Sequence, residues 1–171
     1  MHTNHTADQQ SIPAPPALDI RLLRPGDDAT AFRTLNEEWI VRQFALEPKD
    51  VETLADPERT ILRKGGYILL AHAGGEAVGC VALIPTGPGV FEISKMAVSP
   101  QLRGQGIGRR LLEHAIAHSR TLGAIALFLG TSTKLPAAVH LYESVGFRHV
   151  PPEQLPPNNY ARTDVFMRMT L

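Results

Sequence analysis

A glycine-spaced turn is the part of this sequence best suited to bind an anion. Gly104, Gly106 and Gly108 lie between an apolar segment at 90–98 and a helical pattern that starts near Ile107. Glycine lets the backbone turn sharply, and the first N–H groups of a helix are unpaired and lie at the positive end of its dipole. Three arginines flank the turn: Arg103, Arg109 and Arg110. The residue types and spacing predict a pyrophosphate cradle.

The two commonest phosphate-binding glycine loops do not fit this turn. A dinucleotide loop needs G-x-G-x-x-G, and with Gly104 and Gly106 as the first pair, the third position is Arg109. A P-loop needs Gly-Lys-Ser/Thr, whereas Gly108 is followed by Arg109 and Arg110. The sequence therefore disfavours a nucleotide-binding α/β domain.

Glu92 is a second residue that could do chemistry, because it lies between Phe91 and Ile93 in a predicted strand. A carboxylate in apolar surroundings is costly unless it has a partner or a task. Lys95 and Arg103 are candidates for an ion pair. Without such a pair, burial would raise the pKa of Glu92, which suits a general base. Both interpretations stay open at this point.

Composition restricts the class of protein. The chain has 171 residues, 43% of them hydrophobic and 20% charged, with a formal net charge of zero. This predicts one globular domain and gives no reason to expect nucleic acid or an anionic membrane as partner. The lone Cys80 excludes an internal disulfide and any multi-cysteine metal site. With no apolar run of membrane-spanning length and no signal-peptide pattern, we expect a cytoplasmic enzyme.

Two histidines raise the question of a metal. His114 and His118 lie four residues apart on a predicted helix, but no third ligand is evident in the sequence. We therefore expect no metal ion.

Hydrophobic periodicity places these residues on an ordered series of elements. Residues 1–17 are polar and proline-rich and are expected to form a flexible tail, and 18–171 a single domain. Strand patterns cover about 20–24, 67–73, 77–84, 90–98, 124–129, 147–150 and 164–171. Helical patterns cover about 28–44, 48–54, 57–63, 107–122 and 136–145. The fold class is α/β (α+β), with a mixed, mostly antiparallel, twisted sheet of about seven strands and helices on both faces.

The glycine turn resembles the acyl-CoA loop of the GNAT superfamily of N-acetyltransferases, [QR]-x-x-G-x-[GA], here Gln101, Gly104 and Gly106. A second stretch, 138–147, resembles the A-x-x-L-Y-x-x-x-G-F signature of the same superfamily. The order of predicted elements is also that of the GNAT fold, and the resemblance covers roughly 19–171.

The resemblance implies acetyl-CoA as cosubstrate and no metal. It implies cofactor contacts from the end of the fourth strand and from the glycine turn: Met96, Ala97, Val98, Gln101, Arg103, Gly104, Gln105, Gly106, Ile107, Gly108 and Arg109. Of these, Met96, Ala97 and Val98 would pair with the pantetheine arm through their backbone groups, like an added strand.

The resemblance also implies two catalytic side chains. Tyr142 would lie beside the CoA sulfur and protonate the leaving thiolate, whereas on its spacing alone it would be an amphipathic core residue. Glu92 would act as general base, often through water, because an alkylamine of pKa roughly 10 is almost wholly protonated at neutral pH.

The acceptor is expected to be a primary amine of a small molecule or peptide. The resemblance places it across the sheet from CoA, lined by the first helices and the last loop: Trp39, Phe44, Glu47, Asn158, Asn159, Tyr160 and Arg162. This mixture of side chains identifies no single substrate.

The chain departs from the family pattern at two positions. Many relatives have an asparagine where this chain has Leu135, and an acidic residue near the end of the fifth strand where it has Gly130. The alternative to an enzyme is an acyl-CoA-binding sensor without turnover, against which Glu92 and Tyr142 both argue. A symmetric homodimer is the prior expectation for the assembly.

Overall fold

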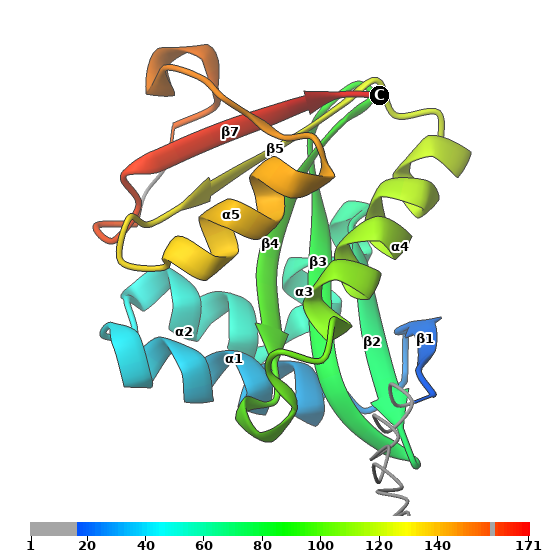
Figure 1. Cartoon of the computed structure of the whole chain (residues 1–171). Coiled ribbons are helices and arrows are strands. Elements are labelled where there is room, and N and C mark those ends of the chain that lie inside the picture. Colours follow the sequence, from blue (N-terminus) through cyan, green and yellow to red (C-terminus); the bar gives the residue numbers. More distant parts are fainter. Residues whose placement is uncertain (1–16, 158–159) are drawn as a thin grey trace, which may run out of the picture.

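Seven strands form one open sheet in the computed structural model, in the order β1-β2-β3-β4-β5-β7-β6 (Figure 1). The structure describes residues 17–157 and 160–171. The strands are β1 Asp19–Leu22, β2 Tyr67–Ala73, β3 Glu76–Gly87, β4 Val90–Val98, β5 Ala126–Thr131, β6 Arg148–His149 and β7 Val165–Thr170. Each lies on or close to a segment with the predicted apolar or alternating pattern.

One pair of neighbouring strands in this sheet is parallel. β4 runs parallel to β5, with Val90–Glu92 beside Ala126–Phe128, and every other pairing is antiparallel. The chain passes from β4 to β5 through the glycine turn and a long helix, as a parallel connection requires. The predicted mixed, mostly antiparallel sheet is therefore confirmed.

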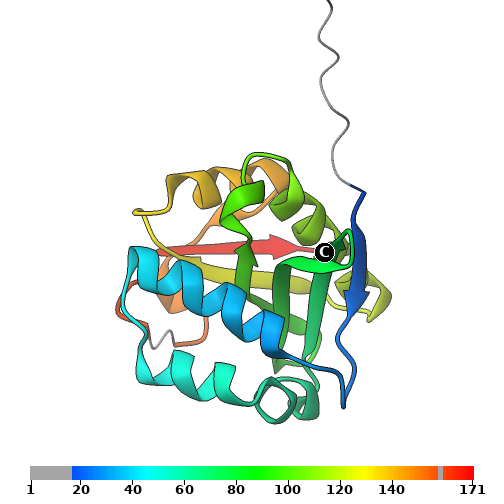
Figure 2. The same cartoon turned by 90° about the horizontal axis from the view of Figure 1, so that it is seen from below.

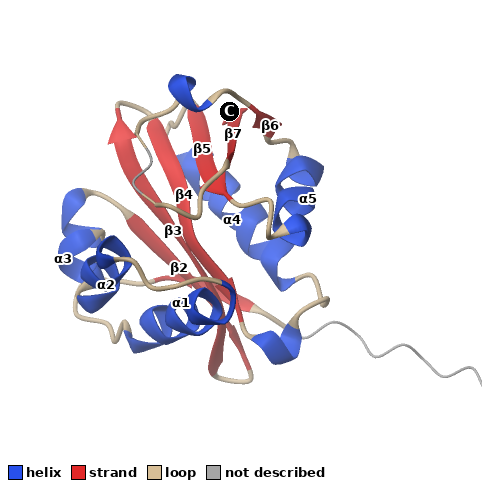
Figure 3. Cartoon of the chain, turned by 90° about the vertical axis from the view of Figure 1, so that its left-hand side faces the viewer, coloured by secondary structure: helices blue, strands red, loops and turns tan. Residues whose placement is uncertain are grey.

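Within the described residues, five helices cover the two faces of the sheet. They are α1 Thr30–Gln43, α2 Pro48–Ala55, α3 Pro57–Thr60, α4 Ile107–Thr121 and α5 Pro136–Val145, with short 3₁₀ turns at Leu62–Lys64, Pro100–Leu102 and Pro152–Gln154. Figure 3 shows α1, α2 and α3 on one side of the sheet and α4 and α5 on the other, and the view from below in Figure 2 agrees.

The core is divided by the sheet into two clusters of buried side chains. On the α4 side, Ile107 and Leu111 are buried against Val81 of β3, together with the apolar side of β5. On the α1 side, Phe32 and Leu54 are buried in a second cluster that includes the central strands. Burying one such side chain contributes about 1.5–3 kcal/mol to the stability of the fold. Because apolar side chains are buried on both faces of the sheet, β3 and β4 are held in place from both sides.

Several predicted boundaries differ by a few residues, and two of the differences have a clear physical reason. β3 continues to Gly87 instead of ending at Ile84, because Pro85 still lies opposite Phe91 in an irregular register that needs no N–H from proline. Helix α1 begins at Thr30, and its N-cap residue is Ala29 with no side-chain cap. Asp28, inside the predicted helical range of about 28–44, lies before the helix and accepts hydrogen bonds from the backbone N–H and the hydroxyl of Thr30. The tail predicted for 1–17 lies almost wholly outside the described residues. None of the described helices combines the length and the apolar character that a membrane crossing requires.

Candidate active site

Strands β4 and β5 diverge after a short parallel pairing. Glu92 lies opposite Phe128 in the last residue pair, and β4 then continues to Val98 with no further partner on β5. The main-chain groups of Met96 and Val98 therefore border the gap between the two strands. An unpaired strand edge of this kind can accept an extended ligand as if it were another strand.

A β-bulge changes the direction of the side chains near the end of β4. Cys80 of β3 lies opposite Ala97 and Ala82 lies opposite Ser94, so two β4 residues, Lys95 and Met96, face one residue of β3. Lys95 has a left-handed backbone with φ of 52°. Bulges commonly redirect a side chain beside a functional site. Here the bulge turns Lys95 to the face covered by α1 and α2.

The predicted pyrophosphate cradle follows β4 as an exposed turn, the green loop at the foot of α4 in Figure 1. Gly104 and Gly106 have φ of 78° and 79°, a backbone conformation that favours glycine. Gly106 is the N-cap of α4, and no side chain caps the helix. A Cβ added at either glycine would meet no protein atom within 4 Å. The turn thus leaves its backbone and the helix N-terminus open to an anion.

The remaining predicted cradle residues have different surroundings. Ile107 is 1% exposed and anchors α4 in the core. A Cβ added at Gly108 would lie 3.5 Å from Leu141 and 3.8 Å from Val98, so this glycine faces α5 and the end of β4. The side-chain oxygen of Gln101 accepts a hydrogen bond from the Ser99 hydroxyl at 2.7 Å. Arg103 and Gln105 are exposed.

Arg109 is oriented towards α5. Its guanidinium donates a hydrogen bond to the Ser144 hydroxyl at 2.6 Å and lies 3.8 Å from a carboxylate oxygen of Glu113. The side chain thus bridges the first turn of α4 to the last turn of α5. Its charge remains close to the helix N-terminus, although its hydrogen bonds are made elsewhere.

Glu92 lies at the point where β4 and β5 separate. Burial raises the pKa of its carboxyl group, and the positive charges of Lys49 and Lys95 oppose that rise. The ammonium of Lys95, one of the two partners considered for an ion pair, lies 2.7 Å from Asp50 instead. Among the described residues Glu92 forms no ion pair, so its carboxylate is available for a proton transfer.

Tyr142 is on α5, 8% exposed, and its ring packs edge-on against Phe147 with centroids 6.0 Å apart. Burial raises the pKa of its phenol to about 12, so the hydroxyl keeps its proton at neutral pH. That hydroxyl makes no hydrogen bond to any residue that the structure describes. The ring is a core side chain, as its spacing predicts, and the hydroxyl is a protonated donor.

Five of the seven residues predicted to line the acceptor side lie in one connected group. The rings of Trp39 and Phe44 meet edge-on at 6.2 Å, and the Arg162 guanidinium lies 5.9 Å from the Trp39 ring and 4.4 Å from the Tyr160 ring. Glu47 accepts a hydrogen bond from Arg162 at 3.2 Å. Asn158 and Asn159 lie outside the described residues.

The sequence interpretation missed the residue at the centre of this group. The Asp50 carboxylate is fully buried and accepts hydrogen bonds from Arg162, Lys95 and the backbone N–H of Glu47. Burial alone would raise its pKa, but these bonds outweigh burial and lower the pKa to about 2. The sequence did contain a signal, because Glu47 and Asp50 have the spacing of a capping box around Pro48.

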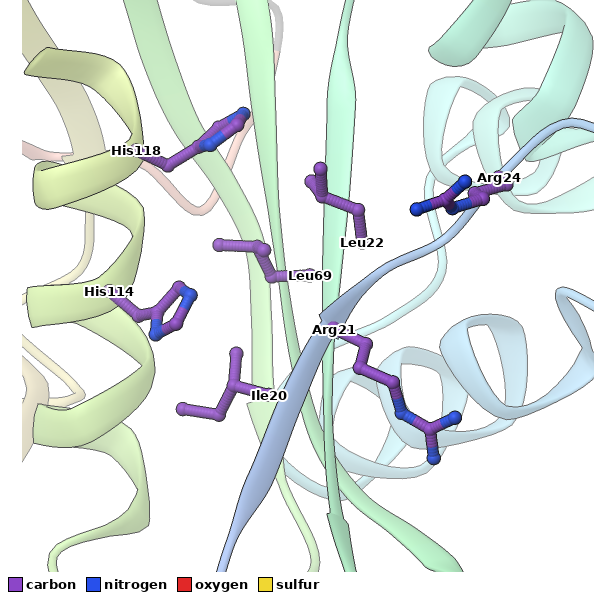
Figure 4. A pocket seen from close by; sticks show the side chains of 7 residues that line it. All are labelled: Ile20, Arg21, Leu22, Arg24, Leu69, His114 and His118. Carbon is purple, nitrogen blue, oxygen red and sulfur yellow. The ribbon is translucent and has the colours of Figure 1, made fainter. Parts of the chain in front are cut away.

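A hollow of about 300 Å³ lies elsewhere, between β1 and α4 (Figure 4). Its lining includes His114 and His118, and Figure 4 shows the Arg21 guanidinium turned away from both imidazoles. Burial, with a smaller effect of His114, lowers the pKa of His118 and favours its neutral form. Within 17–157 and 160–171, no three His, Cys, Asp or Glu side chains gather as a metal site would need.

Comparison with known proteins agrees with this geometry. The family model described as the acetyltransferase (GNAT) family matches residues 31–147. An uncharacterized N-acetyltransferase of Schizosaccharomyces pombe is 31% identical over 162 residues, which cover 92% of this chain and 97% of that protein.

Solved structures show the same fold. A GNAT-family acetyltransferase from Staphylococcus aureus has a TM-score of 0.81 at 22% identity, covering 90% of this chain and 99% of that one. A GNAT-family acetyltransferase from Elizabethkingia anophelis, solved with acetyl-CoA bound, has a TM-score of 0.61 at 24% identity, covering 90% and 98%. The open β4 edge, the glycine turn at the start of α4 and these matches together establish that this chain belongs to the GNAT family of acetyltransferases.

Proposed function

We propose that the protein transfers an acetyl group from acetyl-CoA to a primary amine of a small molecule or peptide, by direct attack in a ternary complex. The observation that carries this proposal is the continuity of the open β4 edge with the glycine turn. The edge offers main-chain groups to an extended arm, and the open backbone around Gly104 and Gly106 offers N–H groups to a pyrophosphate. The acetyl-CoA bound by the Elizabethkingia protein supports the choice of cosubstrate.

Glu92 is assigned the role of general base. An alkylamine of pKa roughly 10 must lose a proton before its nitrogen can attack a carbonyl carbon. Glu92, with its raised pKa and no ion pair among the described residues, accepts that proton directly or through a water molecule. The neutral nitrogen then forms a bond to the thioester carbon and loses its second proton to solvent, while a backbone N–H of β4 stabilises the charge that develops on the oxygen. Glu92 returns its proton to solvent before the next turnover.

Tyr142 is assigned the role of proton donor to the sulfur. When the C–S bond breaks, the thiolate takes the proton of the Tyr142 hydroxyl, which solvent later restores. Burial raises the pKa of Tyr142 to about 12, and the same apolar surroundings raise the pKa of a departing thiol. The rise in the pKa of the thiol offsets the rise in the pKa of Tyr142, so burial does not by itself oppose the transfer.

The test is a thiol-release assay with acetyl-CoA and a panel of small amines, amino acids and peptide N-termini. Thiol release that depends on one class of amine, with formation of the acetylated product, supports the proposal. Binding of CoA without thiol release for any amine would instead favour the acyl-CoA sensor. Binding of ATP or NAD in place of CoA would overturn both.

A further inference from the structure

Lys95 reaches the acceptor side of the sheet through the β4 bulge. In a regular strand it would lie on the same face as Ile93, which is buried in the α4-side core. The bulge places it instead on the face of Ala97, which belongs to the α1-side core. The left-handed backbone of Lys95 is a conformation that residues other than glycine rarely adopt.

The ammonium group of Lys95 joins three elements. It donates a hydrogen bond to Asp50 of α2 at 2.7 Å and another to the Tyr160 hydroxyl, in the segment before β7, at 3.0 Å. It also lies 4.5 Å from the centroid of the Tyr160 ring. The side chain is only 3% exposed, so these contacts are fixed and solvent does not screen them.

Charged groups from several elements surround Glu92. Lys95 comes from the same strand and Lys49 from α2, and both favour the ionised carboxylate against the effect of burial. Tyr160, from the segment before β7, also interacts with Glu92, and its pKa is raised to about 12, chiefly by burial. Lys49 is exposed and Tyr160 is uncharged at neutral pH. Lys95 is therefore the buried cation at a fixed position beside the proposed base.

We propose that Lys95 is a positioning residue of the acceptor site: it holds Tyr160 against α2 and supplies a fixed positive charge that keeps Glu92 ready to accept a proton. This inference rests on the assignment of Glu92 as the base. The bulge is what makes this role possible, because without it the ammonium would lie on the opposite face of the sheet.

A purely structural role explains these observations less well. A buried ion pair contributes little stability compared with well-packed apolar side chains, because both charges must be desolvated. An apolar residue at position 95 on a regular strand would join the Ile93 side of the core without a left-handed backbone. The position instead holds a lysine whose charge acts on Glu92.

The test compares pH profiles of kcat/KM for one amine acceptor at saturating acetyl-CoA. Lys95→Gln removes the charge but keeps a donor, and Asp50 keeps its bonds from Arg162 and Glu47. Loss of a cation raises the pKa of Glu92, so the acid limb should move up by about 0.5–1 pH unit. Lys95→Arg should restore it. Lys64→Gln, which removes an exposed lysine outside this group, is the matched control and should leave the profile unchanged.

Tyr160→Phe tests the bridge separately. It keeps the ring and the charge of Lys95 but removes the oxygen that accepts the hydrogen bond at 3.0 Å. The KM for the acceptor should rise about three- to tenfold. The acid limb of the kcat/KM profile should stay at the wild-type pH, and the KM for acetyl-CoA should not change. This variant removes only an oxygen atom, so it tests the proposal even if Lys95→Gln does not fold.

An acid limb in Lys95→Gln that coincides with the wild type, or an unaltered acceptor KM in Tyr160→Phe, would overturn the proposal. Glu92→Gln separates this failure from failure of the proposed function. If Glu92→Gln loses the acid limb and Lys95→Gln keeps it, only the role of Lys95 is wrong. If Glu92→Gln keeps wild-type rate and profile, Glu92 is not the base and the inference fails with that assignment.

Discussion

The guanidinium of Arg162 donates two hydrogen bonds to the carboxylate of Asp50, at 2.7 and 2.8 Å, across 112 residues of sequence. This pair fastens the segment before β7 to helix α2. Glu47 strengthens the attachment, because its carboxylate also accepts the backbone N–H of Ala161 at 2.9 Å. The contact between α2 and the segment before β7 is thus held by ionic hydrogen bonds as well as by apolar packing, and it forms a wall of the proposed acceptor site.

Asp50→Ala should destabilise the protein by about 3–5 kcal/mol, because it leaves the buried charges of Lys95 and Arg162 without their shared partner. Urea unfolding monitored by circular dichroism measures the change. Glu52→Ala, an exposed carboxylate on the same helix, is the control and should change the free energy of unfolding by no more than about 0.5 kcal/mol. Equal effects of the two substitutions would show that the network does not stabilise the fold.

Stability should depend on pH through Asp50. The pKa of this group is lowered to about 2 in the folded protein from an ordinary value of 3.8. The unfolded chain therefore binds the proton first, and the stabilisation is complete above pH 4 and lost as the pH falls towards 2. The difference in unfolding free energy between wild type and Asp50→Asn should be constant above about pH 4 and shrink below it. A difference that stays constant down to about pH 2.5 would contradict the network.

Gly106→Ala should weaken CoA binding, because the added methyl group lies on the open face of the cradle and a φ of 79° disfavours alanine. Gly123→Ala is a matched control, since Gly123 has a φ of 75°, open surroundings and a place beyond the other end of α4. Both variants should lose about 1–2 kcal/mol of stability. Calorimetry should show weaker CoA binding for Gly106→Ala only, and equal affinities would argue against a cradle at this turn.

Tyr142→Phe should lower turnover by roughly one to three orders of magnitude and leave CoA affinity nearly unchanged. The substitution keeps the edge-on contact with Phe147 and removes only the hydroxyl. Single-turnover thiol release measures the loss. Tyr67→Phe removes a hydroxyl outside the proposed site and should retain full activity. Wild-type turnover in Tyr142→Phe would mean that the ring is structural and that the thiolate leaves unaided.

Glu92→Gln should reduce kcat most at neutral pH, because the amine then lacks a base and is mainly protonated. The rate should recover as the pH rises, since more of the amine is already deprotonated in solution, and the acid limb should disappear or shift. The side chain is nearly isosteric, so thermal unfolding should change little. An unchanged rate with a parallel pH profile would assign the proton transfer to another group.

Local patterns predicted most of the fold. The segments 67–73, 90–98 and 136–145 match β2, β4 and α5 at both ends, because apolar alternation, a proline at the first helical turn and a terminal glycine are all local signals. The end of β3 was missed because Pro85 predicts a turn, whereas an irregular register lets the strand continue past it. Nothing in the local sequence predicts the left-handed backbone conformation of Lys95.

The glycine turn of the candidate site was predictable, because its backbone conformation depends on local residue types. The contacts between side chains that are distant in the sequence were less predictable. Glycine is the residue type that favours positive φ, so the sequence itself indicates the backbone conformation of Gly104 and Gly106, and both adopt positive φ. The partners of Lys95 are 45 and 65 residues away, and no spacing rule connects them. Sequence reasoning placed Lys95 near Glu92 as a candidate ion-pair partner, and the long-range geometry assigned its ammonium to Asp50.

The β4 bulge also bears on how this protein could acquire a new substrate. Under the proposed reaction, main-chain atoms of β4 serve acetyl-CoA, while the side chains of Glu92 and Lys95 on the same strand serve the acceptor. Replacing a side chain does not alter the peptide groups of its neighbours. Substitutions on β4 can therefore change which molecule receives the acetyl group while the strand still binds acetyl-CoA. Recognition of the cosubstrate and recognition of the acceptor can thus evolve separately, although they use residues that are only a few positions apart.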